Sequence, residues 1–204
     1  MLAPIPRPLA TGLSYFARCG CSLPKTTMNM KEITMENFKS LGLPNYLMQA
    51  LDYMKFTTPT PIQAAAIPPA LLGKDILGSA QTGTGKTGAF GIPLIAKPLH
   101  NPRGLALVMT PTRELAVQVM AMMEQLLGAD SGIETALLIG GEPMPKQFSQ
   151  LRRRPRLVVG TPGRINDHLT RGTLKLNEAN FLVLDETDRM LDMGFGIQID
   201  AVVK

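Results

Sequence analysis

Residues 80–87 read Ala80-Gln81-Thr82-Gly83-Thr84-Gly85-Lys86-Thr87, between a short apolar run and a segment of helical periodicity. Glycines at positions 83 and 85 allow backbone N–H groups to turn inward around an anion. A helix that begins at Lys86 would add partial positive charge at the same point. The lysine can reach the β- and γ-phosphates of a nucleotide, and the Thr87 hydroxyl can ligate Mg²⁺. The stretch therefore predicts a phosphate-binding loop, although Ala80 replaces the glycine of the strict motif. A turn without a ligand is the alternative.

Short apolar runs alternate with amphipathic stretches along the rest of the chain. We expect strands at 75–79, 105–110, 135–139, 157–160 and 181–185. We expect helices at 45–53, 62–72, 86–95, 113–127, 144–152, 164–170 and 187–193. Most of the strands are almost wholly apolar, as strands covered on both faces must be. This alternation predicts an α/β fold with an open parallel sheet and helices on both faces.

A pair of adjacent acids ends one of these strands, in Leu182-Val183-Leu184-Asp185-Glu186. Open parallel sheets bind ligands at the carboxyl ends of their strands. Asp185 would hold Mg²⁺ opposite Thr87, and Glu186 would position and deprotonate an attacking water. Two neighbouring carboxylates repel unless a cation lies close by, which favours a metal there. A solvated strand end is the alternative.

Composition sets the class of protein. Hydrophobic residues make up 45% of the 204 residues, enough for a buried core. No apolar run reaches the ~20 residues that span a bilayer. The first 27 residues supply +3 of the net charge of +5, so the remainder is only weakly basic and does not by itself indicate nucleic-acid binding. Both cysteines, Cys19 and Cys21, precede position 31, which leaves the body without a disulfide framework and suits a reducing cytoplasm.

The first 30 residues form a separate leader with prolines at 4, 6, 8 and 24 and no acidic residue before position 32. An organelle transit peptide is one interpretation, because such peptides are rich in arginine and poor in acids. A disordered or spurious leader is the interpretation that we favour, since the prolines oppose a helix. The folded domain is then expected at residues 31–204.

The phosphate loop and the acid pair are shared by many nucleotide hydrolases, but further segments resemble the DEAD-box RNA helicases over residues 38–195. One segment, Phe56-Thr57-Thr58-Pro59-Thr60-Pro61-Ile62-Gln63, resembles the part of that family that reads adenine, and Phe38 stands at the position of its isolated upstream aromatic. A glutamine amide offers the donor and the acceptor that adenine requires, and an aromatic ring can stack on the base. A surface amide is the alternative for Gln63.

Three further segments resemble family motifs that contact the sugar-phosphate backbone of RNA. Each follows an expected strand: Pro111-Thr112-Arg113-Glu114-Leu115-Ala116, Gly140-Gly141 and Thr161-Pro162-Gly163-Arg164. Arginine, threonine and helix N-termini bind phosphates well and read no bases, so the expected RNA binding is independent of sequence. The tract Arg152-Arg153-Arg154-Pro155-Arg156 could also contact RNA, but we favour cations that face solvent at a helix C-terminus.

The resemblance implies a RecA-like domain that binds ATP with Mg²⁺, with Lys86 and Glu186 as catalytic residues, and a cytoplasmic location. The signature tetrad reads Asp185-Glu186-Thr187-Asp188, where the family has alanine at the third position. The family continues past this point with a Ser-Ala-Thr motif and a second RecA-like domain, which this sequence does not contain. We therefore expect an incomplete domain of marginal stability, since the family's Ser-Ala-Thr strand lies between the phosphate-loop strand and the Asp-Glu strand.

Two functions remain open at this point. The first is ATP-dependent RNA unwinding by a full-length parent protein. The second is a truncated, catalytically inactive nucleotide-binding fragment.

Overall fold

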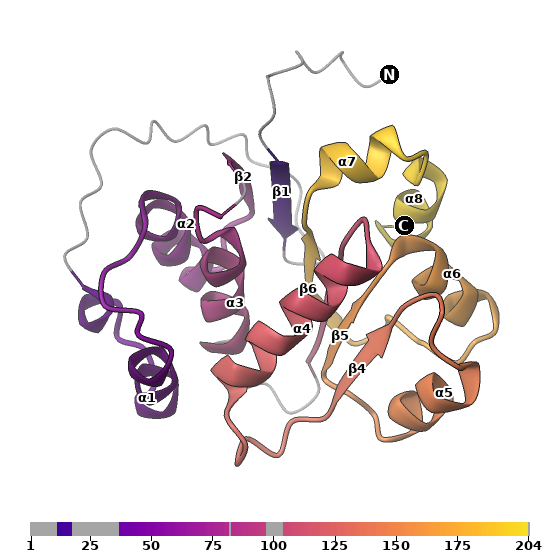
Figure 1. Cartoon of the computed structure of the whole chain (residues 1–204), viewed down its shortest axis with the longest axis horizontal. Helices are drawn as coiled ribbons and strands as arrows, with labels where there is room; N and C mark the ends of the chain where they lie inside the picture. The colour runs from indigo at the N-terminus through magenta and orange to yellow at the C-terminus, as the bar shows by residue number, and fades with distance from the viewer. Residues whose placement is uncertain (1–11, 18–36, 82, 97–103, 204) are drawn as a thin grey trace.

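The computed structural model describes residues 12–17, 37–81, 83–96 and 104–203, and within them a single sheet has the strand order β2-β1-β6-β3-β5-β4 (Figure 1). The strands are β1 (Gly12–Ala17), β2 (Ile76–Ala80), β3 (Leu105–Met109), β4 (Thr135–Leu138), β5 (Leu157–Gly160) and β6 (Ala179–Leu184). Strands β6, β3, β5 and β4 are mutually parallel. The expected open parallel sheet is confirmed, with one antiparallel strand that we did not expect.

Helices alternate with these strands as the periodicity predicted. They are the 3₁₀ turn η1 (Phe38–Leu41), α1 (Asn45–Tyr53), α2 (Pro61–Leu71), α3 (Lys86–Ala96), α4 (Arg113–Leu127), α5 (Met144–Arg152), α6 (Pro162–Thr170), α7 (Thr187–Asp192) and α8 (Gly196–Val203). Helix α6 begins two residues before the expected start because proline is favoured at the first position of a helix. The sequence did not predict η1 or α8.

Side chains alternate between two cores, one on each face of the sheet. Along β3, Ala106 and Val108 join a core with α1, α2, α3 and α4, while Leu105, Leu107 and Met109 join a second core with α6, α7 and α8. This period of two follows from the pleat of a strand. Because both faces are covered, the strands are apolar throughout, and the expected helices on both faces are confirmed.

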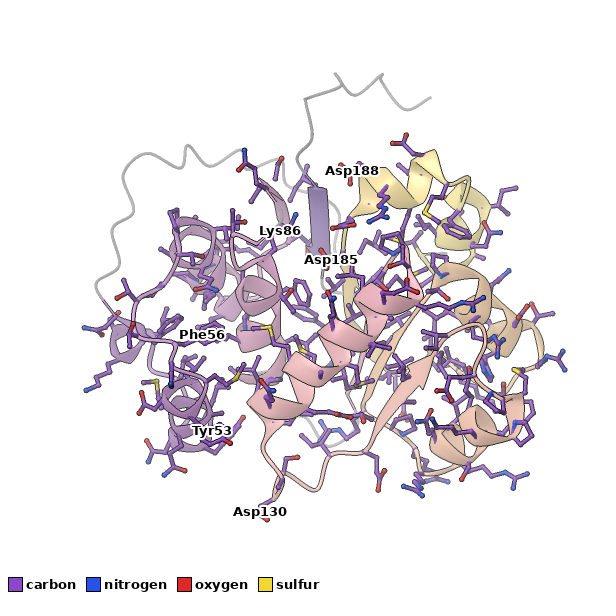
Figure 2. The ribbon with its side chains drawn as sticks, in the orientation of Figure 1. Tyr53, Phe56, Lys86, Asp130, Asp185 and Asp188 are labelled. Carbon is purple, nitrogen blue, oxygen red and sulfur yellow. The ribbon has the colours of Figure 1, made fainter. Side chains whose placement is uncertain are left out.

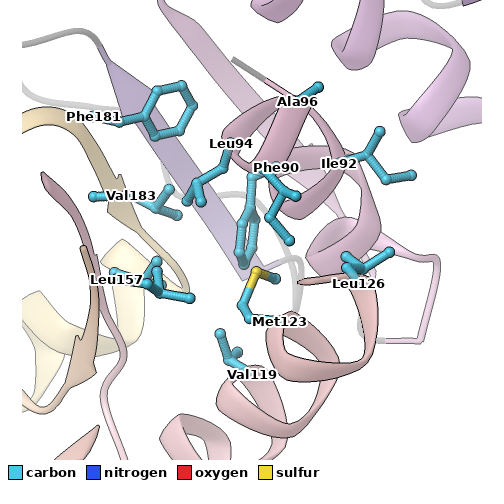
Figure 3. Close-up of a cluster of buried hydrophobic side chains, with 14 of the residues drawn as sticks. Phe90, Ile92, Leu94, Ala96, Val119, Met123, Leu126, Leu157, Phe181 and Val183 are labelled. Atoms are coloured by element: carbon cyan, nitrogen blue, oxygen red, sulfur yellow. The ribbon is translucent and has the colours of Figure 1, made fainter. Parts of the chain in front are cut away.

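The larger core lies between the sheet and the pair α3 and α4 (Figure 3). Phe90 of α3 and Met123 of α4 are fully buried there, beside Leu157 of β5 and Val183 of β6. Helix α3 approaches α4 closely at Gly91, where an added Cβ would lie 2.4 Å from the Met123 methyl carbon. This contact fixes α3, and with it the start of α3 at Lys86, against the rest of the domain.

Strand β1 comes from the leader and lies in the middle of the sheet. It pairs antiparallel with β2 on one side and with β6 on the other, and Tyr15 is opposite both Leu77 and Leu184. The expectation of a disordered or spurious leader therefore does not hold for Gly12–Ala17, and the other leader residues lie outside the described ones. The unpaired backbone that we expected between β2 and β6 is likewise corrected, because β1 pairs with both strands.

Residue types explain why this strand was missed. The run Gly12-Leu13-Ser14-Tyr15-Phe16-Ala17 contains two aromatic residues that favour strands. The run stands, however, among prolines that indicate irregular structure. Its pairing partners, β2 and β6, come from distant parts of the chain, so the local sequence does not reveal them.

We expect Tyr15→Pro to lower the free energy of unfolding by about 1–3 kcal/mol relative to Tyr15→Ala, because proline removes a backbone N–H from a strand paired on both sides. The alanine variant controls for loss of the side chain. Urea unfolding followed by circular dichroism would measure the difference. Equal stability of the two variants would show that β1 is not paired in solution.

Candidate functional site

The carboxyl ends of the four parallel strands lie level with one another. The backbone N–H groups of Asp185, Thr110 and Thr161 each donate a hydrogen bond to the carbonyl of the last residue of a neighbouring strand, over 2.9, 3.0 and 3.0 Å. The strand ladder therefore continues one residue beyond β6, β3 and β5. As a result, the loops that follow these strands, and the loop after β4, begin side by side along one edge of the sheet.

The phosphate loop leads from β2 into α3, as the sequence predicted. Gly83 and Gly85 have φ angles of +82° and +89°, which side chains other than glycine rarely adopt. Lys86 is the first residue of α3 and is buried, and its Nζ donates to the Ala80 carbonyl over 2.8 Å. The Thr84 hydroxyl donates to the Gln81 carbonyl over 2.6 Å. The ammonium group of Lys86 is thus held across the loop, while Thr82 lies outside the described residues.

Gln63 connects the expected adenine segment to this loop. Its side chain is 1% exposed, so the alternative of a surface amide is wrong. The Thr60 N–H donates to Oε1 over 3.0 Å, and Nε2 donates to the Gly85 carbonyl over 3.0 Å. An added Cβ at Gly85 or Gly88 would lie 2.6 or 2.7 Å from Nε2, so both glycines are needed for this approach. These two bonds use one lone pair and one amide hydrogen of Gln63, which leaves one of each.

The two aromatic residues predicted for the adenine site lie against each other. The ring centroids of Phe38 and Phe56 are 6.1 Å apart, with the planes tilted by 53°. Phe38 is 2% exposed and Phe56 is partly exposed, so only Phe56 offers a ring to a ligand. Phe56 also lies over the start of α3, because an added Cβ at Gly88 would be 3.2 Å from its Cε1.

The acid pair follows β6 directly. Asp185 is 3% exposed and Glu186 is 8% exposed, and Figure 2 shows Asp185 and Lys86 near β1. Glu186 adopts φ 53° and ψ 50°, a left-handed conformation that is unusual for a residue with a side chain. Its Oε2 accepts a hydrogen bond from Arg189 Nη1 over 3.2 Å. Backbone strain of this kind is often found where a side chain must be aimed for function.

The threonine of the tetrad makes a local hydrogen bond. The Thr187 hydroxyl donates to the Leu184 carbonyl over 2.9 Å, so its polar group is satisfied by the strand that precedes it. The substitution of threonine for alanine therefore leaves no polar group without a partner. Helix α7 begins at this residue.

Oxygen ligands are available for the expected Mg²⁺. The Thr87 hydroxyl and the Asp185 carboxylate are both hard ligands, as Mg²⁺ prefers. Within the described residues, no group of three or more His, Cys, Asp or Glu side chains could hold a metal ion. Few protein ligands are what Mg²⁺ requires when it is bound mainly by water and substrate phosphates. The residues present therefore fit a nucleotide-bound magnesium ion.

The segments expected to bind RNA meet along the other half of the edge. Arg113, the first residue of α4, is exposed and lies over the loop after β4. An added Cβ at Gly140 or Gly141 would be 2.8 or 2.7 Å from its guanidinium nitrogens, so the two glycines make room for this arginine. Thr112 caps α4 by accepting a hydrogen bond from the Leu115 N–H over 3.2 Å. Pro111 precedes it and is buried.

Arg164 is held inside this group of loops. Its Nη1 contacts the Glu142 carbonyl at 3.4 Å and the Met144 sulfur at 2.9 Å, and its side chain is 17% exposed. Thr161 and Gly163 are partly exposed at the start of α6, and Pro162 is buried. Arg164 therefore ties α6 to the loop after β4, while Thr161 and Gly163 stay partly exposed.

Two buried polar residues that sequence analysis missed lie beneath these loops. Gln147 is 1% exposed and His168 is 0% exposed, and their side chains are hydrogen-bonded at 3.1 Å. Burial lowers the pKa of His168, as do Arg164 and Arg171, against the opposing effect of Asp167. The only feature of the sequence that could have pointed to this pair is a histidine on the buried side of α6. A single buried histidine does not by itself indicate a function.

The basic tract at 152–156 lies at the opposite edge of the sheet, where β5 begins. Arg153 is exposed and pairs with Glu134 at 3.7 Å, and the Nε of Arg156 donates to the Gly104 carbonyl over 3.3 Å. Burial lowers the pKa of Arg156. The tract therefore lies at the other end of the strands from the loops that are expected to bind RNA. No helix in the described part of the chain is both long and apolar enough to cross a membrane.

Comparison with known proteins identifies the family. Residues 60–204 match the DEAD/DEAH box helicase family. The chain is 46% identical over 170 residues to the DEAD-box ATP-dependent RNA helicase CshA of Geobacillus kaustophilus (strain HTA426), a match that covers 83% of this chain and 36% of that protein. The chain thus spans about a third of the length of this curated relative.

Solved structures agree with this assignment. A DEAD box protein from the hyperthermophile Methanococcus jannaschii has a TM-score of 0.71 and 39% identity, over 80% of this chain and 45% of that chain. A hypothetical ATP-dependent RNA helicase from Sulfolobus tokodaii has a TM-score of 0.68 and 32% identity, over 78% of this chain and 46% of that chain. This chain therefore belongs to the DEAD/DEAH box helicase family.

Proposed function

We propose that this chain binds ATP with Mg²⁺ at the β2 and β6 half of the sheet edge, and the sugar-phosphate backbone of RNA at the β3, β5 and β4 half. In the full-length protein, ATP hydrolysis would drive local unwinding of duplex RNA. The supporting observation is the shared edge itself. The Asp185 N–H donates to β3, so the acid pair lies directly beside the loops that carry Arg113 and Thr161.

The nucleotide half has the groups that phosphoryl transfer requires. Backbone N–H groups of the loop and the N-terminus of α3 would surround the phosphates, and Lys86 would exchange its bond to the Ala80 carbonyl for the β- and γ-phosphates. Thr87 and Asp185 would hold Mg²⁺, which when bound neutralises phosphate charge. Glu186 would orient the attacking water and take its proton. Its left-handed backbone and its bond to Arg189 support this role, because both fix where the carboxylate points.

Adenine would be recognised between Phe56 and Gln63. The remaining amide hydrogen and lone pair of Gln63 match the ring nitrogen and amino group of adenine. Phe56 would stack on the base, while the buried Phe38 supports Phe56 from behind. Since the same Gln63 side chain holds the Gly85 carbonyl, adenine binding and the shape of the phosphate loop are linked through one residue.

RNA would be bound through its sugar-phosphate backbone. Arg113 is exposed above the Gly140-Gly141 turn, and the backbone of that turn is open to a ligand beside it. The N-terminus of α6 at Thr161 and Gly163 adds N–H donors and a partial positive charge. Because contacts to sugar and phosphate carry no sequence information, we expect similar affinity for RNAs of different sequence.

We expect Glu186→Gln to leave the affinity for a fluorescent ATP analogue within about twofold, while ATP turnover falls about 10²-fold or more, the usual contribution of a general base. Both are measured on this 204-residue chain and on the full-length protein, with and without RNA. Binding without turnover in this chain would fit an ATP-binding domain that needs other parts of the protein. Failure to bind ATP would contradict the proposal.

We expect Gln63→Leu to weaken ATP binding about tenfold and GTP binding much less, because about two hydrogen bonds to adenine are lost. Competition titrations against the fluorescent analogue would measure both affinities. The exposed amide Gln49 on α1 provides the control, since Gln49→Leu removes a surface group away from the loop. An equal loss for ATP and GTP would mean that Gln63 only shapes the phosphate loop.

We expect Arg113→Ala to weaken binding of single-stranded RNA to a similar extent for different homopolymers, and to reduce the slope of log affinity against log salt by about one. Arg153→Ala is the matched control, because that arginine is exposed at the opposite edge of the sheet. Fluorescence anisotropy with labelled RNA would measure both variants. The interpretation would be wrong if the two substitutions had the same effect.

A further inference from the structure

A buried side-chain pair joins the two helices that follow the proposed RNA-binding loops. Gln147 lies on α5, which begins after the loop at residues 140–143, and His168 lies on α6, which begins in the Thr161–Arg164 segment. The Nε2 of His168 and the Oε1 of Gln147 are 3.1 Å apart, although 21 residues separate them in the sequence. Neither residue touches the nucleotide half of the edge or is exposed to a ligand.

Gln147 holds the backbone on both sides of the Gly140-Gly141 turn. Its Nε2 donates to the Ile139 carbonyl over 2.9 Å and to the Glu142 carbonyl over 3.2 Å. Both amide hydrogens are therefore used within the loop after β4. The Oε1 atom has only an acceptor role, so the hydrogen in its bond with His168 must come from the imidazole.

This requirement places a hydrogen on Nε2 of His168. A neutral imidazole with its hydrogen on Nε2 donates to Gln147 and leaves Nδ1 as an acceptor for the Thr173 hydroxyl at 2.9 Å. The same Thr173 hydroxyl also donates to the His168 carbonyl at 3.1 Å, so its single hydrogen is shared between that oxygen and Nδ1. The ring of Phe148 packs edge-on against the imidazole, with centroids 5.6 Å apart. Burial, which lowers the pKa of His168, agrees with a neutral ring.

A second link joins the same two segments. Arg164 stands one helical turn before His168, and its Nη1 contacts the Glu142 carbonyl that also accepts from Gln147. The loop after β4 is thus attached to α6 both through the buried pair and through the partly buried arginine. In this arrangement, the Gly140-Gly141 turn cannot shift relative to the N-terminus of α6 without breaking several of these bonds.

We propose that Gln147 and His168 are positioning residues for RNA, which hold the Gly140-Gly141 turn and the N-terminus of α6 at the spacing that successive phosphates of one strand require. This inference rests on the proposed RNA binding of these loops. The ligand is the sugar-phosphate backbone, and the pair acts on it only through the two loops. ATP affinity should not depend on it, because the nucleotide half is built from other residues.

A double-mutant cycle tests this coupling. Gln147→Leu, His168→Leu and the double variant are compared with the wild-type chain for three quantities: the Kd for labelled single-stranded RNA, the Kd for a fluorescent ATP analogue, and the melting temperature. Each single variant should raise the RNA Kd about tenfold, because buried hydrogen-bonding groups lose their partners. The RNA Kd of the double variant should be no higher than that of the single variant with the higher RNA Kd. The ATP Kd should stay within about twofold of the wild-type value.

Loss of stability alone must be separated from loss of positioning. Leu47→Ala provides that control, because Leu47 of α1 is fully buried in the other core and contacts neither loop. It should lower the melting temperature and leave the RNA Kd unchanged. The proposal is overturned if Leu47→Ala raises the RNA Kd as much as His168→Leu, if the two single effects multiply in the double variant, or if neither affects RNA affinity.

Nuclear magnetic resonance gives a readout that does not need RNA. The imidazole nitrogen shifts of His168 should show the neutral form with hydrogen on Nε2, and the amide signals of Gly140 and Gly141 should move in both single variants. If the wild-type chain binds no RNA while these signals behave as expected, the proposed function fails but the link between the loops stands. Unchanged glycine signals would overturn the link itself.

Discussion

The hydrogen-bond ladder of the parallel strands is the constraint on which the rest of this structure depends. β6, β3, β5 and β4 are paired up to their last residues, and the ladder continues through the N–H groups of Asp185, Thr110 and Thr161. The strand ends are consequently level, and every loop with an expected role starts on the same edge. Neither the acid pair nor the basic loops would meet if one strand were shifted by a residue, because such a shift also moves each side chain to the other face.

Strand β1 sets the width of the nucleotide half. Neighbouring strands lie about 4.8 Å apart, so a strand between β2 and β6 separates the phosphate loop from the acid pair by about 10 Å. That spacing leaves room for phosphate groups and a cation between Lys86 and Asp185. The strand comes from the leader and runs antiparallel to both neighbours. Residues Gly12–Ala17 of the N-terminal leader are thereby part of the sheet that carries the site.

Two buried glutamines play similar parts on the two halves of the edge. Gln63 binds the phosphate loop through the Gly85 carbonyl, and Gln147 binds the loop after β4 through two carbonyls. Leaving a buried polar group without a partner costs about 1–3 kcal/mol, so each amide strongly favours one shape of its loop. The Arg113 guanidinium packs against Gly140 and Gly141, where any side chain would displace it. The loops of this site are therefore shaped by polar contacts from below as well as by their own sequences.

Sequence alone determined the elements and the chemistry that depends on local spacing. Strand and helix periodicity gave the five parallel-running strands and most helices within one or two residues, and Gly83, Gly85 and Lys86 indicated a phosphate loop because turn geometry and helix start are local properties. Tertiary structure alone decided the placement of β1, since the pairing of a 6-residue strand depends on two distant neighbours. It also decided the burial of Gln63 and the contact between Gln147 and His168. A glutamine or histidine has the same local preferences on a surface or in a core, and only the packing of helices from distant parts of the chain distinguishes the two.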